Sequence, residues 1–153
     1  MRVLVQRVRH ATVSVQGEQV AAIGPGLLLF VAVGDADDPA DTTYLADKIV
    51  NLRIFPDETS RFNSSALDTG AELLVVSQFT LYADTRKGRR PSFTNAAPPE
   101  RAAEEIERLV GLLRATGLTV ATGRFQEMMD VSLVNDGPVT IWIDSADRHR
   151  PRG

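Results

Sequence analysis

The amino-acid sequence predicts an α+β fold in which a mixed β-sheet of several strands carries two main helices. Residues 27–33 and 73–76 are continuous apolar runs, which are typical of strands covered on both faces. Two other segments place apolar residues at helical spacing, and each follows a start signal that contains proline. Strands buried on both faces need other elements to cover them, so these patterns favour layers of helix and sheet.

Near the N-terminus the sequence predicts a buried strand followed by a hairpin. Residues 1–9 are rich in valine and leucine, whereas residues 12–15 alternate and lead through Gly17 into residues 19–23. An alternating run that returns through a glycine turn is typical of a β-hairpin. Arg7 interrupts the apolar stretch, so its side chain either lies at a solvated strand edge or pairs with a group inside the protein.

Both helices have recognisable starts. The first is predicted to begin at Pro39 with Asp38 as its N-cap. The second and longest is predicted from residues 98–100 to Gly117, and we interpret it as purely structural. Its expected solvent-facing residues are Glu104, Glu105, Glu107 and Arg108, with an ion pair between Glu104 and Arg108.

Shorter segments complete the predicted domain, which spans residues 1–144. Residues 53–55 and 118–121 are rich in apolar residues and predict short strands. Residues 145–153 are polar and contain three arginines. We expect this C-terminal stretch to be a flexible tail.

Two runs of apolar and β-branched residues, within residues 131–143, flank the corner Asn135-Asp136-Gly137-Pro138. This pattern predicts strand, tight turn and strand. Pro138 has no N–H, and an X-Pro bond adopts the cis form at a cost of only about 0.5–1 kcal/mol. Such a corner can present two main-chain carbonyls with almost no side chain in the way. The alternative interpretation is a plain hairpin turn.

Polar residues also end the apolar run at residues 73–76, in the order Ser77-Gln78-Phe79-Thr80. The end of a buried strand is a rigid place at which polar atoms reach the surface, so it is a common position for a functional site. Capping of the strand end by the two hydroxyls is the alternative interpretation.

A basic loop follows. Within residues 84–95, four cations surround Gly88 and lie close to aromatic residues. This arrangement suits a phosphate backbone, although a solvated basic loop is the alternative. The four cations are Arg86, Lys87, Arg89 and Arg90.

Composition narrows the function classes. The 153 residues have a formal net charge of −3, so nucleic-acid binding would depend on local positive charge. The chain has no cysteine and two distant histidines, which excludes a cysteine nucleophile and gives no pattern for a metal or cofactor site. No run reaches the length of a membrane span, and residues 1–4 begin a strand rather than a signal peptide. We therefore expect a cytoplasmic protein without a cofactor.

The motifs Ser77-Gln78-Phe79-Thr80 and Asn135-Asp136-Gly137-Pro138-Val139-Thr140 together resemble the D-aminoacyl-tRNA deacylases. Gln6-Arg7-Val8 and residues 90–93 and 122–125 match the same family in the same order, so the resemblance covers about residues 1–143. Several separated motifs in one order are far more specific than any single motif.

The resemblance implies a strongly curved, barrel-like sheet in a C2 homodimer, and hydrolysis of the ester of D-aminoacyl-tRNA. It implies catalytic roles for Gln78, Phe79 and Thr80. The main-chain N–H groups around Phe79 and Thr80 can hold the ester carbonyl, while the 2′-hydroxyl of the substrate assists water. It further implies that Ser77, Phe125 and Met129 bind the terminal aminoacyl-adenosine, and that Arg7 fixes the corner.

The same resemblance implies how handedness is selected. The Gly137-Pro138 corner comes from the other subunit, occupies the space that an L side chain needs, and leaves a D side chain pointing to solvent. Glycine has no side chain and passes this filter. Two alternatives remain open from the residues alone: a non-catalytic tRNA-binding module, and a hydrolase of small esters with Thr80 as nucleophile.

Overall fold

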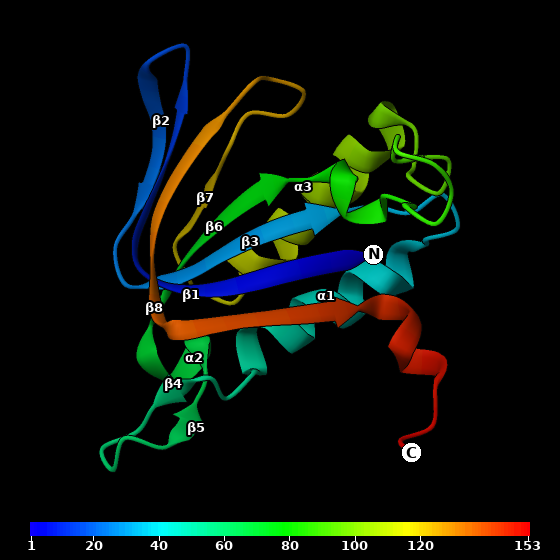
Figure 1. The fold of residues 1–153 in the computed structure, drawn as a ribbon. Helices are drawn as coiled ribbons and strands as arrows, with labels where there is room; N and C mark the ends of the chain where they lie inside the picture. Colours follow the sequence, from blue (N-terminus) through cyan, green and yellow to red (C-terminus); the bar gives the residue numbers. More distant parts are fainter.

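The computed structural model describes residues 1–153, and Figure 1 shows a curved sheet with long helices beside it. The predicted α+β fold with a curved mixed sheet and two main helices is confirmed. The strands are β1 (Arg2–Val15), β2 (Glu18–Ile23), β3 (Gly26–Ala32), β4 (Phe55–Pro56), β5 (Phe62–Ser64), β6 (Glu72–Ser77), β7 (Val120–Thr122) and β8 (Asp130–Asp144). The helices are α1 (Pro39–Asn51), α2 (Ala66–Thr69) and α3 (Pro99–Ala115), with 3₁₀ helices η1 (Phe79–Tyr82) and η2 (Ser145–His149).

The long strand β1 organises the sheet because it has partners on both edges. Along one edge β3 pairs with its first half and β2 with its second half, while β8 follows the other edge over nearly its whole length. These pairs are antiparallel, whereas β6 lies parallel to both β3 and β7. β1 changes its pairing partner from β3 to β2 along its length. The sheet therefore curves around a second, smaller apolar cluster that includes Val13, Leu28 and Val76.

The predicted hairpin at residues 135–138 is wrong. β8 is one strand, and both of its halves pair with β1. Val8 pairs with Asn135 and Gln6 pairs with Thr140, so the four residues 136–139 lie opposite the single residue Arg7. The corner is therefore a large bulge in a continuous strand. Local turn residues do not distinguish a chain reversal from a bulge, because that depends on which strand pairs on each side.

The helices α1 and α3 contact each other and pack against one face of the sheet. α1 begins as predicted: the Asp38 carboxylate accepts the N–H groups of Ala40 and Asp41, and the Asp41 carboxylate accepts the Asp38 N–H. No helix is both long and apolar enough to cross a membrane. The main core lies between these helices and the sheet and includes Val3, Leu29, Leu45, Ile49, Leu73, Val75, Leu109 and Leu113.

The prediction that Glu105 faces solvent is wrong. Its side chain is buried, accepts a hydrogen bond from the Thr42 hydroxyl at 2.6 Å, and lies 3.3 Å from Arg108. Arg108 thus pairs with Glu105 rather than with Glu104. A buried carboxylate needs such partners, and Thr42 comes from α1, which helical spacing within α3 does not reveal.

The expected flexible tail is partly folded. Residues Ser145–His149 form η2 against α1, and the Ser145 N–H donates to the Met1 carbonyl at 2.8 Å. Arg148 lies 3.3 Å from Asp41 and 3.5 Å from Asp38 at the start of α1. These contacts join η2 to the start of α1. The folded part of the chain therefore extends beyond residue 144.

Candidate active site

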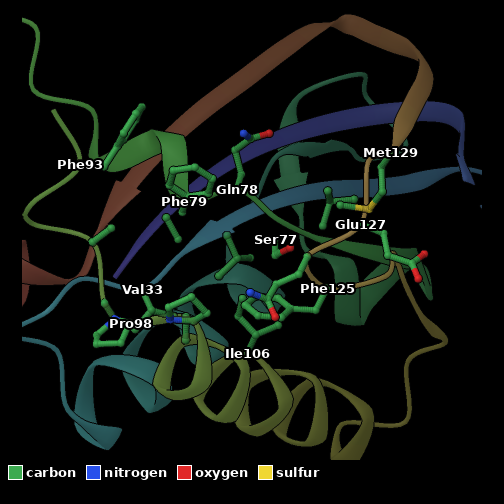
Figure 2. A pocket seen from close by; sticks show the side chains of 18 of the residues that line it. Val33, Ser77, Gln78, Phe79, Phe93, Pro98, Ile106, Phe125, Glu127 and Met129 are labelled. Atoms are coloured by element: carbon green, nitrogen blue, oxygen red, sulfur yellow. The ribbon is translucent and has the colours of Figure 1, made fainter. Parts of the chain in front are cut away.

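A cavity of about 900 Å³ opens where β6 ends and the chain enters η1 (Figure 2). The ends of β3 and β6 form one side, α3 forms a second, and the segment before β8 forms a third. Most of the lining residues are apolar, with a few polar groups among them. A concave site of this size and character is typical of small-ligand binding.

Five of the predicted site residues meet in this cavity. Ser77, Gln78 and Phe79 line it from the end of β6, and Phe125 and Met129 line it from the segment that precedes β8. Figure 2 shows Phe125 close to Ser77, and Met129 near Glu127 on the side of the cavity away from Phe93. Residues separated by about 50 positions in the sequence therefore share one pocket.

The main chain at the end of β6 leaves two donors free. The Gln78 N–H donates to the Val31 carbonyl at 2.8 Å and extends the sheet, and the Leu81 N–H donates to the Gln78 carbonyl at 3.1 Å. Between them, the N–H groups of Phe79 and Thr80 occupy the first two positions of η1, where helix N–H groups have no acceptor within the helix. Free N–H groups beside a cavity can stabilise an oxyanion when a carbonyl is attacked there.

The Thr80 hydroxyl lacks the neighbour that a nucleophile requires. Its oxygen accepts a hydrogen bond from the Gln78 side-chain amide. An amide NH₂ group donates protons and does not take one. No histidine or carboxylate bonds the hydroxyl, so nothing in the chain activates Thr80 for attack.

The helix α3, which its sequence pattern predicts to be purely structural, is a wall of the cavity. Pro99, Ala102 and Ile106 line the pocket, and Figure 2 shows Ile106 beneath Phe125. Ile106 is only partly buried, whereas Leu109 on the same helix is fully buried. Helical spacing places both residues on one face, and it does not show which of them lies under the open part of the sheet.

The corner of β8 is held together by its own side chains. The side-chain Oδ1 of Asn135 accepts the Val139 N–H at 2.9 Å, and the side-chain Nδ2 of Asn135 donates to the Thr140 hydroxyl at 2.9 Å. Gln6 of β1 donates to the same hydroxyl at 3.2 Å. The bulge is thus closed at its base, and the exposed Gly137 and Pro138, joined by a cis peptide, form its tip.

Arg7 lies inside the protein, directly under the corner. Its Nη1 donates to the Ile54 carbonyl at 2.7 Å, its Nε lies 3.3 Å from the Asp136 carboxylate, and its guanidinium lies over the Phe62 ring at 5.2 Å. A Cβ at Gly137 would be 3.0 Å from Nη2 of Arg7. The inward-pairing alternative for Arg7 is therefore the one found, and the guanidinium supports the corner from below.

The cavity and the corner lie at different places on the same sheet. Ser77 is in register with Val31, Val3 and Ile143, whereas the corner lies opposite Arg7. Four residues along β1 and three strand spacings separate them, or about 14 Å along the strands and about 14 Å across the sheet. Gly137, Pro138 and Arg7 do not line the cavity of their own chain.

The basic loop leaves η1 and returns beside the cavity. The N–H groups of Asp84 and Ser92 each donate to the carbonyl of the other, at 2.8 and 2.9 Å, which closes the loop. Arg86 folds back onto the Asp84 carboxylate with contacts of 2.9 and 2.7 Å, and these hydrogen bonds hold the pKa of that carboxyl at about 2. The remaining cations are exposed and take part in no ion pair: Lys87, Arg89 and Arg90.

Sequence reasoning missed the roles of three side chains. Asn135 belongs to a recognised motif, but its bracing of the bulge depends on the unpredicted course of β8. Phe93 lies 5.0 Å from Phe79, edge to face, and lines the cavity mouth. Arg2 donates to the Leu81 carbonyl at 2.9 Å and so holds the end of η1. Of these three residues, only Phe93 could have been singled out from the sequence, because it is an aromatic residue next to the basic loop.

Comparisons with known proteins find relatives of this chain over nearly its whole length. The family model described as D-Tyr-tRNA(Tyr) deacylase matches residues 4–144. A D-aminoacyl-tRNA deacylase of Roseiflexus sp. (strain RS-1) is 59% identical over 152 residues, which cover 99% of this chain and 98% of the relative.

Solved structures share the fold. The c-Myc DNA unwinding element binding protein has a TM-score of 0.89 and 38% identity, over 94% of this chain and 98% of that one. A probable eukaryotic D-amino acid tRNA deacylase has a TM-score of 0.80 at 17% identity, over 93% of this chain and 97% of that one. At that identity the second likeness concerns the fold alone.

Proposed function

The chain belongs to the D-Tyr-tRNA(Tyr) deacylase family, and from this premise we propose that it is a cytoplasmic, homodimeric editing hydrolase. Its substrate is tRNA that carries a D-amino acid, or glycine, as an ester on the ribose of the terminal adenosine. Hydrolysis releases the free amino acid and the tRNA. The observation that carries this proposal is the apolar cavity with two free N–H groups beside it.

In the proposed reaction the protein positions the ester rather than supplying a side-chain base. The adenosine lies against Phe125 and Met129, next to Ser77, and the ester carbonyl accepts the N–H groups of Phe79 and Thr80. Water attacks the carbonyl carbon, the bond to the ribose oxygen breaks, and the ribose hydroxyl of the substrate assists the proton transfer. Loss of one such donor typically lowers kcat about 10²–10³-fold.

The corner selects handedness in a neighbouring copy of the chain. Gly137 and Pro138 are exposed and lie far from the cavity of their own chain, so the proposed filter acts on the cavity of a partner. An L side chain would collide with the corner, a D side chain would point away, and glycine would pass. Selection of this kind works by excluding the wrong substrate rather than by gripping the right one.

Association of two copies fits the surface around β8. This strand pairs only with β1, so its other edge is free. Trp142 and Val134 on β8 are among the few exposed large apolar residues, at 48% and 42% exposure. A second copy would bury these side chains and cover the strand edge, which removes an aggregation risk.

Two alternatives make different predictions. A small-ester hydrolase would need Thr80 as nucleophile, but the only partner of its hydroxyl is the Gln78 amide. We therefore expect Thr80→Ala to retain most of the activity, whereas a Thr80 nucleophile would lose all of it. A non-catalytic module would bind tRNA without any turnover.

The direct experiment measures release of D-tyrosine and L-tyrosine from separately charged tRNA(Tyr), with release of glycine from its tRNA as a third arm. We expect rapid release of the D-amino acid and of glycine, with the L-ester unchanged over the same period. Equal rates on the two enantiomers, or no release of the D-amino acid, would end the proposal. Light scattering of the same sample measures whether the chain is a dimer.

A further inference from the structure

We propose that the aromatic pair Phe79 and Phe93 is a stacking platform for the base that precedes the terminal adenosine. The enzyme would then bind at least two nucleotides of the acceptor end. This inference rests on the proposed function and deepens it, because it names the part of the tRNA that the mouth of the cavity holds. Four features of the structure support it in turn.

The first feature is the exposure of Phe79, whose partner Phe93 is half-buried. Phe79 is 57% exposed although it lines an apolar cavity. Its ring lies 5.0 Å from that of Phe93 at an interplanar angle of 70°. In an edge-to-face pair each ring orients the other, and a face of the pair remains free for a third ring. Figure 2 shows both rings at one side of the cavity, away from Phe125.

The second feature is the continuity of the pair with the basic loop. Phe93 directly follows Ser92, whose main chain closes the loop with Asp84 through two hydrogen bonds. The loop therefore leaves and returns at fixed points, and its cations cannot drift far from the aromatic pair. Base stacking next to a positively charged path is the usual way in which proteins bind single-stranded nucleic acid.

The third feature is local charge. The whole chain carries −3, yet residues 85–99 contain four basic residues and no acidic one. Arg86 is engaged by Asp84, which leaves Lys87, Arg89 and Arg90 available to phosphate groups. A positive loop on an acidic protein complements a polyanion and does not complement a basic or neutral partner.

The fourth feature is the order of these parts. The aromatic pair lines the cavity, and the cations lie in the segment of the loop that directly precedes Phe93. A strand whose 3′ end enters the cavity would meet them in the same order, with the terminal adenosine inside, the preceding base on the rings and the phosphates along the loop.

The test compares two esters of D-tyrosine, D-tyrosyl-adenosine and the trinucleotide D-tyrosyl-CCA, in the full-length protein. Phe93→Leu keeps an apolar side chain but removes the ring, and Phe93→Trp keeps a ring. Leu67→Ala is the matched control, because Leu67 is also a large exposed apolar residue, at 40% exposure, and lies on α2 outside the cavity.

We expect Phe93→Leu to lower kcat/KM for the trinucleotide ester by roughly tenfold, which is within the range measured for one stacked base. The same variant should lose less activity on D-tyrosyl-adenosine, because that ester has no preceding base to stack on the ring. Phe93→Trp and Leu67→Ala should match the wild type on both esters. Equal loss on both esters would mean that Phe93 only supports Phe79, and no loss on either would mean that no base rests there; both results overturn the inference.

A binding measurement separates this inference from the proposed function. The probe is uncharged CCA in which 2-aminopurine replaces the middle base, since stacking on an aromatic ring quenches its fluorescence. Quenching by the wild-type protein but not by Phe93→Leu supports the platform even if neither ester is hydrolysed, a result that would refute the deacylase proposal alone. Hydrolysis of both esters without quenching would refute the platform alone.

Discussion

The cavity beside η1 and the corner of β8 differ in how firmly their polar groups are held. At the cavity, the N–H groups of Phe79 and Thr80 begin η1 and have no acceptor within that helix. At the corner, Asn135 makes two hydrogen bonds across the base of the bulge, and Arg7 contacts it from below. The cavity thus keeps donors available for a ligand, whereas the corner presents a fixed surface whose shape can exclude one.

The separation of the two regions adds to this contrast. The cavity lies at the open end of the sheet, which suits a binding site. A steric filter needs a rigid support, and the corner of β8 has one because it is paired with the middle of β1. Because the two regions lie about 20 Å apart on the sheet, estimated from strand spacing and rise, the proposed mechanism cannot use both of them within one chain. A symmetric dimer would bring each corner to the cavity of the other copy.

The largest expected effect comes from Gly137→Ala. The added methyl group would lie 3.0 Å from both Arg7 Nη2 and Val139 Cγ2, and the φ of +119° is one that L side chains rarely adopt. The corner must therefore shift, and a displacement of this kind lowers a rate by about 100-fold when positioning carries catalysis. Single-turnover deacylation of D-tyrosyl-tRNA measures this loss, and the same assay with the L-ester measures any loss of chiral selection.

Gly117→Ala is the matched control for that substitution. Gly117 also has a positive φ, +91°, but nothing lies within 4 Å of its added Cβ. Both variants carry the backbone cost of a left-handed residue, about 1–3 kcal/mol, and only Gly137→Ala disturbs the corner. Equal activity losses in the two variants would show that reduced stability, and not the corner, explains the effect.

Mixing two inactive variants tests whether the regions work in different copies. Phe79→Pro removes one free N–H at the first position of η1, where proline breaks no backbone hydrogen bond. Refolded as an equal mixture with Gly137→Ala, it forms heterodimers in which one site has both defects and the other has none. We expect about a quarter of wild-type activity in the mixture, from the statistics of a C2 dimer, whereas sites built within one chain would stay inactive.

Arg7→Met should have an intermediate effect. The variant keeps the bulk of the buried stem but loses the hydrogen bond to the Ile54 carbonyl and the contact with Asp136. Asp136 is partly exposed and retains Arg9 at 3.8 Å, so no buried charge is left unpaired. We expect a loss of about 2 kcal/mol in unfolding free energy and a roughly tenfold lower kcat from a looser corner. Full activity in the destabilised variant would make Arg7 a structural residue only.

The elements that the sequence predicted well are those with local causes. The capping of α1 by Asp38 and the buried runs of β3 and β6 depend on residues next to one another, and all are confirmed. The errors at Glu105, at residues 145–149 and at the corner share another cause. Each depends on a partner distant in the chain, namely Thr42, α1 and β1, which no local pattern identifies.

The candidate site divides in the same way. The segment 77–79 could be placed at a strand end from its own pattern, and it does line the cavity. Phe125 and Met129 came only from family resemblance, because their spacing is also that of ordinary core residues. The roles of Ile106, Phe93 and Asn135 required the path of the whole chain, since each depends on a residue of another element.

The smallest expected effect concerns the basic loop. Arg89→Ala removes a cation that has no ion-pair partner, so we expect KM for the tRNA ester to rise about threefold and the salt dependence of binding to weaken by about 0.7 in log–log slope, as for one lost contact to a single strand. Titration of binding against salt concentration measures both quantities. Lys87→Ala should behave in the same way.

Arg86→Ala is the matched control for Arg89→Ala. It changes the net charge by the same one unit, but Arg86 already bonds Asp84, whose pKa of about 2 keeps that carboxylate ionised at any physiological pH. Removing Arg86 therefore alters the long-range field without removing a free donor. If the salt slope falls equally in Arg86→Ala and Arg89→Ala, the loop acts through its total charge, and the contrast between a paired and a free cation has no role in tRNA binding.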